Sequence, residues 1–168
     1  MQNMSMGIAL GRVTDNHDRE GQGRVEIEFV MLGPEAPRRW CYVASPAAGG
    51  DRGFFFMPEI HDEVIVAFDH GNFDHSYIIG YPWNPVQPPP STHPSERMIR
   101  SREGHTIRFV DSQPNGGNHG ALIIQDAHGN VVTMTNGVMT IQSKVHLNIN
   151  AVSMTIMGRP VNPLGGEI

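Results

Sequence analysis

A regular succession of short apolar pairs between residues 131 and 157 constrains this chain more than any other feature. Each pair holds two apolar residues separated by one polar residue, and each begins seven or eight residues after the one before it. Alternation with a period of two predicts strands that are buried on one side only. The Asn136-Gly137 dipeptide adds a tight-turn signal between two of them. The four pairs are Val132/Met134, Met139/Ile141, Leu147/Ile149 and Met154/Ile156.

These strands offer too little apolar surface to form a core by themselves. Each contributes two apolar side chains, and a stacked β-structure needs a neighbouring layer to cover such a stripe. The cover must come from another sheet or from further copies of the chain. We therefore predict that the repeat region self-associates.

The composition predicts an all-β chain. Hydrophobic residues make up 39% of the 168 residues, and 19 Gly and 13 Pro indicate frequent turns. We find no window of eleven or more residues with the apolar spacing and the caps of a helix. The net charge of −5, with 12 Lys and Arg, argues against a nucleic-acid partner, because phosphates require a basic face.

Redox and targeting signals are sparse. Cys41 is the sole cysteine, so the sequence holds neither a disulfide framework nor a multi-thiolate metal site, and we expect it to be packed in a strand. The N-terminal MQNMSMG lacks the basic and apolar segments of a secretory signal, and no apolar run approaches the ~18 residues of a membrane-spanning helix. We expect synthesis in the cytoplasm, with any export carried out by other machinery.

Turn residues divide the chain into two β-modules. Residues 1–84 are predicted to form a small barrel or sandwich. Large aromatic residues are the candidates for its core and packing, namely Trp40, Phe54, Phe56, Phe68 and Trp83. Its strands are expected over residues 7–13, 24–32, 39–44, 54–57, 63–68 and 77–81, with a loop over 69–76.

A proline-rich linker over residues 85–96 separates the modules. The stretch from Asn84 to Pro94 holds five of the 13 prolines, which favours an extended spacer over a sheet. A ligand for a partner domain is the alternative interpretation. The second module, residues 97–168, begins with strands expected over 98–101, 106–110 and 121–125. After Met157 the pattern stops at Gly158-Arg159-Pro160, and we expect no further strand of useful length in residues 161–168.

The first module resembles the OB domain of contractile-tail spikes, a family that includes the valine-glycine repeat protein G (VgrG) of type VI secretion and the baseplate spikes of contractile phages. The resemblance covers roughly residues 7–110 and is specific as an ordered set. The residues that carry it are Gly11-Arg12-Val13, Asp15-Asn16, Asp18, Gly21, Gly23-Arg24-Val25, Trp40, Val43-Ala44, Pro46, Gly53 to Glu59, His61 to Val64, Phe68, Gly71-Asn72, Tyr77 to Gly80, Trp83-Asn84, Arg100-Ser101 and Gly104 to Phe109.

This resemblance implies an N-terminal OB-fold barrel followed by an intertwined triple-stranded β-helix in a homotrimer. It also implies a spike that pierces a target envelope, is mounted on baseplate hub or tail tube proteins, and carries a PAAR-type tip. Because the chain begins directly at the OB domain, it resembles the short phage spikes that use a separate hub protein. The side chains expected on the trimer axis are Val132, Met134, Met139, Ile141, Leu147, Ile149, Met154 and Ile156.

Nine histidines raise the question of a metal. His70 and His75 lie with two aspartates in one polar stretch, for which a solvated hairpin is the favoured interpretation. Some phage spikes bind iron on the trimer axis through a His-x-His near the tip, and His146 is the similar candidate here. The alternation places Leu147 and Ile149 inside, so His146 is expected to point outward and no cofactor is predicted.

The sequence also lacks the usual signatures of catalysis. The carboxylate pairs Glu26/Glu28 and Asp62/Glu63 lie on or beside strands and lack the opposed arrangement that acid–base chemistry requires. We therefore expect no enzyme activity. Two alternatives remain, an OB-fold module that binds glycan or nucleic acid, and a spike with a hidden role in cell-wall cleavage.

Overall fold

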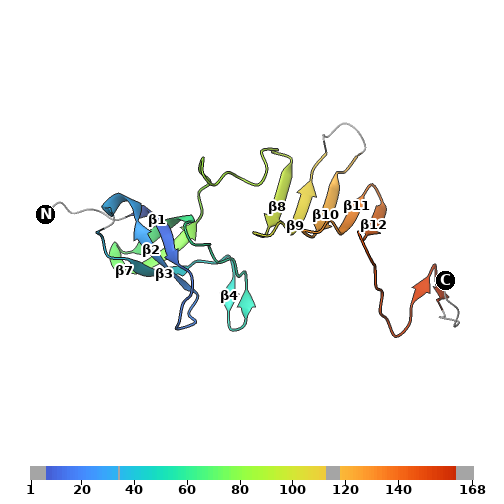
Figure 1. The fold of residues 1–168 in the computed structure, drawn as a ribbon, viewed down its shortest axis with the longest axis horizontal. Coiled ribbons are helices and arrows are strands. Elements are labelled where there is room, and N and C mark those ends of the chain that lie inside the picture. The colour runs from blue at the N-terminus through green and yellow to red at the C-terminus, as the bar shows by residue number, and fades with distance from the viewer. Residues whose placement is uncertain (1–6, 34, 113–117, 162–168) are drawn as a thin grey trace. The chain divides into compact units, whose positions relative to one another are not determined.

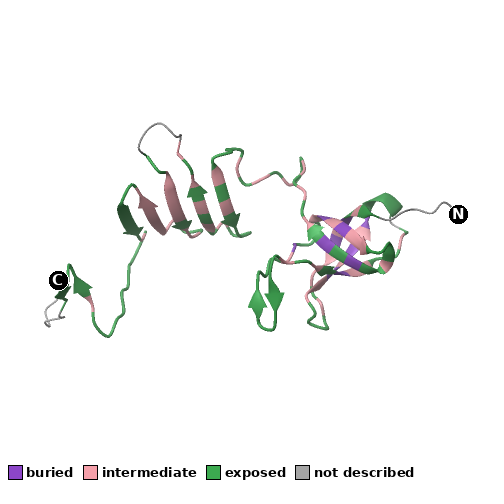
Figure 2. Ribbon diagram, turned by 180° about the vertical axis from the view of Figure 1, so that it is seen from behind, coloured by how far each residue is buried: buried purple, intermediate pink, exposed green. Residues whose placement is uncertain are grey.

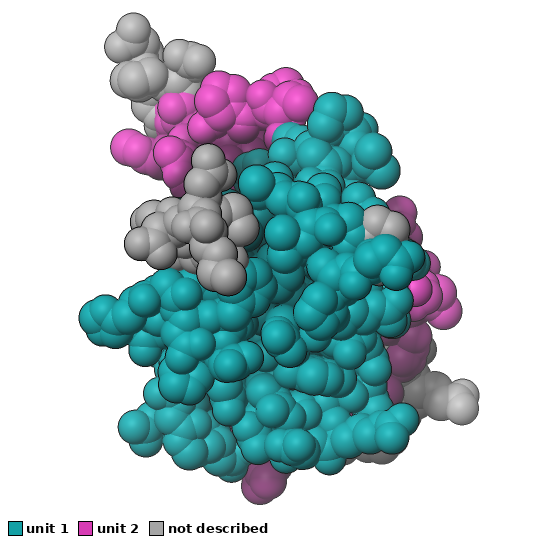
Figure 3. Space-filling view, turned by 90° about the vertical axis from the view of Figure 1, so that its left-hand side faces the viewer, with its two compact units in different colours: residues 1–89 teal, residues 90–168 magenta. Residues whose placement is uncertain are grey.

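The computed structural model describes residues 7–33, 35–112 and 118–161. Apart from a short 3-10 helix, η1 (Val30–Leu32), the regular elements among these residues are strands, so the all-β prediction is confirmed. The chain, whose strands are labelled in Figure 1, divides into two units, residues 1–89 and 90–168 (teal and magenta in Figure 3), and the boundary falls within the predicted linker. In the described part of the chain, no helix is long and apolar enough to cross a membrane.

Five strands of the first unit close into a barrel in the order β1-β2-β3-β7-β6. Neighbouring strands are antiparallel except β3 and β7, which are parallel. A closed barrel of five strands is the arrangement of an OB-fold, so the predicted N-terminal barrel is confirmed. The strands are β1 (Ile8–Asp15), β2 (Arg24–Phe29), β3 (Arg39–Val43), β6 (Glu63–Asp69) and β7 (Asn72–Gly80).

The barrel core consists mainly of branched aliphatic side chains, and the ribbon of the buried residues is purple in Figure 2. On β2, Val25, Ile27 and Phe29 are buried while the residues between them are half-buried, as the alternation predicts. Phe29 contacts Phe68 and Phe73, with ring centroids 5.7 and 5.1 Å away, and these rings close one side of the core. The buried hydrophobic residues are Val13, Val25, Ile27, Phe29, Cys41, Val64, Val66 and Ile78.

The prediction of an aromatic core was wrong at three positions. Phe54, Phe56 and Trp83 have exposed fractions of 55%, 55% and 70%. Phe68 packs against the core, whereas Trp40 is half-buried because it alternates with the buried Cys41 on β3. The interior of a five-stranded barrel is narrow, and aliphatic side chains pointing inward from every strand already fill it.

Three predicted strand bounds also differ from the structure. Residues 30–32, expected to end the second strand, form the 3-10 helix η1. Residues 54–57 form no strand; two-residue strands β4 (Ala48–Gly49) and β5 (Arg52–Gly53) precede them instead. The loop predicted over residues 69–76 is largely strand, because β7 begins at Asn72 after a tight turn. His70 and Gly71 make this turn with φ values of 50° and 76°, a left-handed pair typical of two-residue hairpin loops.

Cys41 is buried in β3, as predicted, and has a buried polar neighbour. Its Sγ atom lies 2.9 Å from the Oγ atom of Ser76, with either atom able to donate the hydrogen bond. Burial raises the pKa of the Cys41 thiol, which keeps it protonated. The residue therefore serves packing rather than nucleophilic chemistry.

The second unit contains one antiparallel meander in the order β12-β11-β10-β9-β8. Asn136 and Gly137, with φ values of 49° and 78°, form the predicted sharp turn between β11 and β12. None of the described residues between 90 and 161 is buried, so this sheet is a single layer without a core of its own (Figure 2). Its strands are β8 (Glu96–Arg100), β9 (Thr106–Val110), β10 (Ala121–Gln125), β11 (Val131–Thr135) and β12 (Val138–Gln142).

The predicted succession of strands does not continue regularly beyond β12. Residues 143–154 form no strand, which corrects the expectation for the Leu147/Ile149 pair. A small hairpin follows, in which β13 (Thr155–Ile156) pairs with β14 (Arg159–Pro160). Met157 and Gly158 adopt positive φ values and turn the chain back between these two strands. The expectation of no further strand of useful length concerned residues 161–168, of which 162–168 lie outside the described residues.

Candidate functional site: an uncovered apolar sheet face

The strand register of the second unit places apolar residues of all five strands on one side of the sheet. One row across the strands pairs Ile99 with Ile107, Ile124, Val132 and Ile141 in turn. Because directly paired residues point to the same side, this row and the next parallel row share a face. We call this side the apolar face. Its ten positions are Arg97, Ile99, Ile107, Phe109, Leu122, Ile124, Val132, Met134, Met139 and Ile141.

Nine of these ten described positions are apolar, and the sheet leaves them open to solvent. Met139 and Ile141 on the edge strand β12 have exposed fractions of 61% and 56%. Phe109 on β9 is 48% exposed, and the side chains of the inner strands are half-buried or exposed. Contiguous exposed apolar surface of this kind marks an interaction site.

A row of hydrogen-bonded polar residues borders the apolar face where strands β8, β10 and β12 end. The backbone nitrogen of His105 donates to Ser101 Oγ over 3.0 Å, and His105 Nδ1 accepts from the Ala127 backbone nitrogen over 3.3 Å. Asn130 then links two turns: its Nδ2 donates to Asp126 Oδ2 over 2.7 Å, and its Oδ1 accepts from the Lys144 backbone nitrogen over 2.9 Å. This row of hydrogen bonds connects the turns and forms a polar border along the apolar face.

Four of the eight predicted axis residues meet on the apolar face, namely Val132, Met134, Met139 and Ile141. The other four, Leu147, Ile149, Met154 and Ile156, lie outside the five-stranded sheet. Their place on a trimer axis stays a prediction. Sequence reasoning missed five members of the face, although the alternation of TIRFV and the apolar run ALIIQ held the signal for them: Ile99, Ile107, Phe109, Leu122 and Ile124.

The histidine candidates remain separate from one another. The His146 side chain is exposed, and its backbone oxygen accepts a hydrogen bond from Ser143 Oγ over 2.8 Å. The His70 side chain is 98% exposed at its turn. Over residues 7–33, 35–112 and 118–161, no group of three or more His, Cys, Asp or Glu residues could hold a metal ion.

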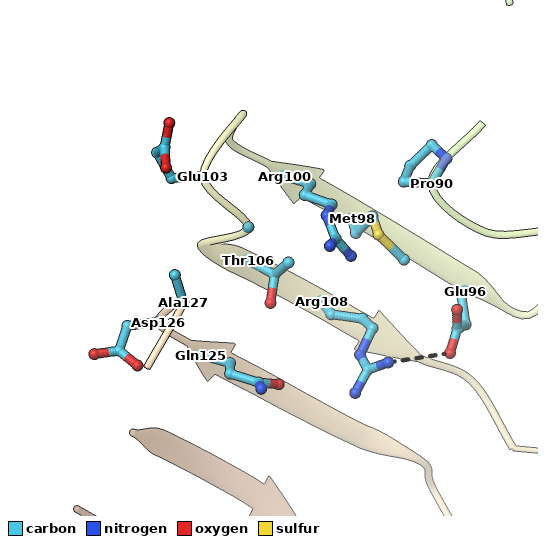
Figure 4. Close-up of a pocket in the computed structure, with 11 residues that line it drawn as sticks. Pro90, Glu96, Met98, Arg100, Glu103, Thr106, Arg108, Gln125, Asp126 and Ala127 are labelled. Carbon is cyan, nitrogen blue, oxygen red and sulfur yellow. Dashed lines mark ion pairs between the residues drawn. The ribbon is translucent and has the colours of Figure 1, made fainter. Parts of the chain in front are cut away.

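The opposite side of the same sheet is more polar, with nine polar and six apolar residues at its fifteen described positions. A shallow open hollow lies over β8, β9 and β10 and is lined by charged and amide side chains (Figure 4). Arg108 Nη1 lies 3.5 Å from Glu96 Oε1, and the second oxygen of Glu96 accepts from Ser91 Oγ over 2.6 Å. Opposite charges thus neutralise each other at a partly buried site, where the Arg108 and Glu96 side chains are 33% and 17% exposed. The sheet therefore has one almost wholly apolar side and one more polar, mixed side, the pattern of an element that lacks one partner layer.

The Asp-rich loop of the barrel is built around one carboxylate. Asp18 accepts hydrogen bonds from the backbone nitrogens of Glu20, Gln22 and Arg24, and both of its oxygens accept from the Arg24 guanidinium at 3.0 and 3.1 Å. The Arg24 guanidinium, with these backbone donors, holds the pKa of Asp18 well below its usual range. The Asp18 and Arg24 residues singled out by the spike resemblance therefore fix the connection between β1 and β2.

Replacing Asp18 with Asn is expected to lower the thermal midpoint of the barrel at pH 7. Because its folded-state pKa is depressed, Asp18 contributes stability above its unfolded pKa of about 4, and this contribution disappears as the pH falls through the folded value. The variant should therefore lose less stability than the wild type between pH 4 and pH 2. Thermal unfolding followed by circular dichroism across this range measures both effects.

Asp15→Asn is the matched control, because the Asp15 carboxylate accepts a hydrogen bond from the His17 backbone nitrogen but belongs to no ion pair with Arg24. Equal acid sensitivity in the Asp18 variant and the wild type would contradict the assignment.

Comparison with known proteins identifies a domain family that matches the barrel. The family described as the type VI secretion system/phage-baseplate injector OB domain matches residues 9–83. The actin cross-linking toxin VgrG1 of Vibrio cholerae serotype O1 is 35% identical over 79 residues, which are 45% of this chain and 7% of the relative. The chain therefore spans a small part of the curated relative that it matches. The resemblance to the contractile-tail spike family is confirmed through this barrel, and residues 9–83 belong to the type VI secretion system/phage-baseplate injector OB domains.

Proposed function

We propose that the chain is one of three identical subunits of the central spike of a contractile injection machine. The observation that carries this proposal is the apolar face, nine apolar side chains on a single-layer sheet, of which six are exposed and three half-buried. This sheet follows a barrel of the baseplate-injector family in the same chain. Three such sheets arranged about a common axis would cover one another's apolar faces and leave their polar sides to solvent.

The energy available from this covering is large. Each half-exposed aliphatic or aromatic side chain gains about 1 kcal/mol when its remaining surface is buried, so the nine contribute on the order of 10 kcal/mol per chain. The net stability of a whole domain is about 5–15 kcal/mol. Association therefore supplies the stabilisation that a single-layer sheet lacks.

Residues 143–154 fit the same proposal. This stretch alternates apolar and polar residues around Leu147 and Ile149, yet it forms no strand within the single chain. Extended segments become regular strands when a neighbour supplies backbone hydrogen bonds. We propose that the other two copies supply them, so that Leu147, Ile149, Met154 and Ile156 continue the axis in an intertwined triple-stranded β-helix.

The role that follows is mechanical. A trimer with continuous interchain hydrogen bonds and no free sheet edges is stiff, and sheath contraction would drive it through the target envelope. The barrels would mount the needle on hub or tail tube proteins, and a PAAR-type protein would cap its C-terminal end. The proposed spike acts outside the producing cell and has no catalytic step.

The solution mass of the purified full-length chain tests this proposal. Three copies per particle support it, and a monomer at micromolar concentration contradicts it.

A further inference from the structure

One charged side chain lies within the apolar face. Arg97 on β8 pairs directly with Phe109 on β9, and it is the one charged residue among the ten described positions of that face. Its guanidinium forms an ion pair with the carboxylate of Asp111, which directly follows β9. The backbone nitrogen of Asp111 donates to the Ser95 oxygen over 2.9 Å, which extends the β8–β9 ladder and places Asp111 on the same side as Arg97.

In a single chain this ion pair contributes little to the stability of the sheet. The side chains of Arg97 and Asp111 are 66% and 63% exposed, and ion pairs in contact with water contribute little because solvent screens both charges. Covering the apolar face would change their environment completely. Both charges would leave water together, and each would then depend on the other for compensation.

We propose that the three Arg97–Asp111 ion pairs of the trimer form a ring that is enclosed between the subunits at the β8 strands. Stable association of the trimer depends on this ring. This inference rests on the proposed trimer, and it adds two residues that the apolar pattern alone would exclude. A chain that lost one partner would bring three uncompensated like charges into the axis. The paired ring instead enters the interface with no net charge.

The polar side of the same two strands provides a matched control. Arg108 and Glu96 also link β9 to β8, but on the face that remains in solvent. Glu96→Gln removes this pair while its side chain keeps an oxygen that accepts from Ser91. The two sites occupy opposite sides of the sheet, and they also differ in exposure, because the Arg108 and Glu96 side chains are 33% and 17% exposed in the single chain.

The test compares the dissociation of the full-length wild type with that of Asp111→Asn, Arg97→Met, Glu96→Gln and the exchanged double variant R97D/D111R. Analytical ultracentrifugation over a dilution series measures it. Each single change in the ring should raise the dissociation constant on the order of hundredfold or more. Glu96→Gln should change it by less than about tenfold, and the exchanged pair should recover much of the loss.

The outcomes separate the two proposals. A wild-type trimer that Asp111→Asn leaves as stable as Glu96→Gln does would overturn the enclosed ring alone. An exchanged double variant that dissociates as readily as the single variants would also contradict the enclosed ring. A monomeric wild type would overturn both the ring and the proposed spike.

Discussion

Replacing Ile141 with Asp is expected to abolish the trimer. Ile141 lies at the β12 end of the apolar face and is 56% exposed in the single chain, so the chain itself tolerates a carboxylate there. In the proposed trimer three carboxylates would be enclosed near the axis, at a cost of several kcal/mol for each buried charge. That cost is comparable to the energy that the apolar face contributes. Gel filtration with light scattering should show a monomer.

Thr140→Asp is the control for this experiment. Thr140 is the neighbour of Ile141 on β12, is also exposed, and points to the polar side of the sheet. The two variants carry the same new charge and differ in the side of the sheet that receives it. Trimers in both variants would show that the apolar face is not the interface, whereas loss in Ile141→Asp alone supports it.

Replacing Ile27 with Ala is expected to destabilise the barrel by roughly 2–5 kcal/mol, the usual range when a buried aliphatic side chain is truncated. Ile27 is fully buried on β2 and packs closely against Gly11 on β1. A Cβ atom added at Gly11 would lie 2.8 Å from Ile27 Cδ1. The cavity therefore lies against a rigid strand and cannot collapse easily. Urea unfolding followed by tryptophan fluorescence measures the loss.

Ile79→Ala makes the same chemical change on the outside of the barrel, where Ile79 is 50% exposed on β7. The truncation removes the same atoms without leaving an enclosed cavity, so we expect an effect below about 1 kcal/mol. Similar losses in both variants would contradict the placement of the core.

The sequence predicts the barrel well because its signals are local. On β2, strict alternation identifies Val25, Ile27 and Phe29 as inward residues, and the structure buries all three. The aromatic residues were harder to place, since exposure depends on how much room the closed barrel leaves. Trp83 and Phe54 are exposed and lie outside the strands of the barrel. No local sequence pattern distinguishes such residues from residues of the core.

The apolar face is predictable only in part, because strand pairing defines it. The repeat identifies Val132, Met134, Met139 and Ile141 by their spacing. Ile99, Phe109 and Leu122 join them only once the register of β8, β9 and β10 is known. The segment around Leu147 shows the opposite limit, since its alternation predicts a strand but the single chain offers it no hydrogen-bonding neighbour.

The solution mass of the full-length chain at micromolar concentration tests the central claim most directly. Light scattering should give three times the mass of one chain, and the trimer should persist in SDS at room temperature, because the interface combines an enclosed apolar surface with interchain strand pairing. A clean monomer under the native condition would contradict the account.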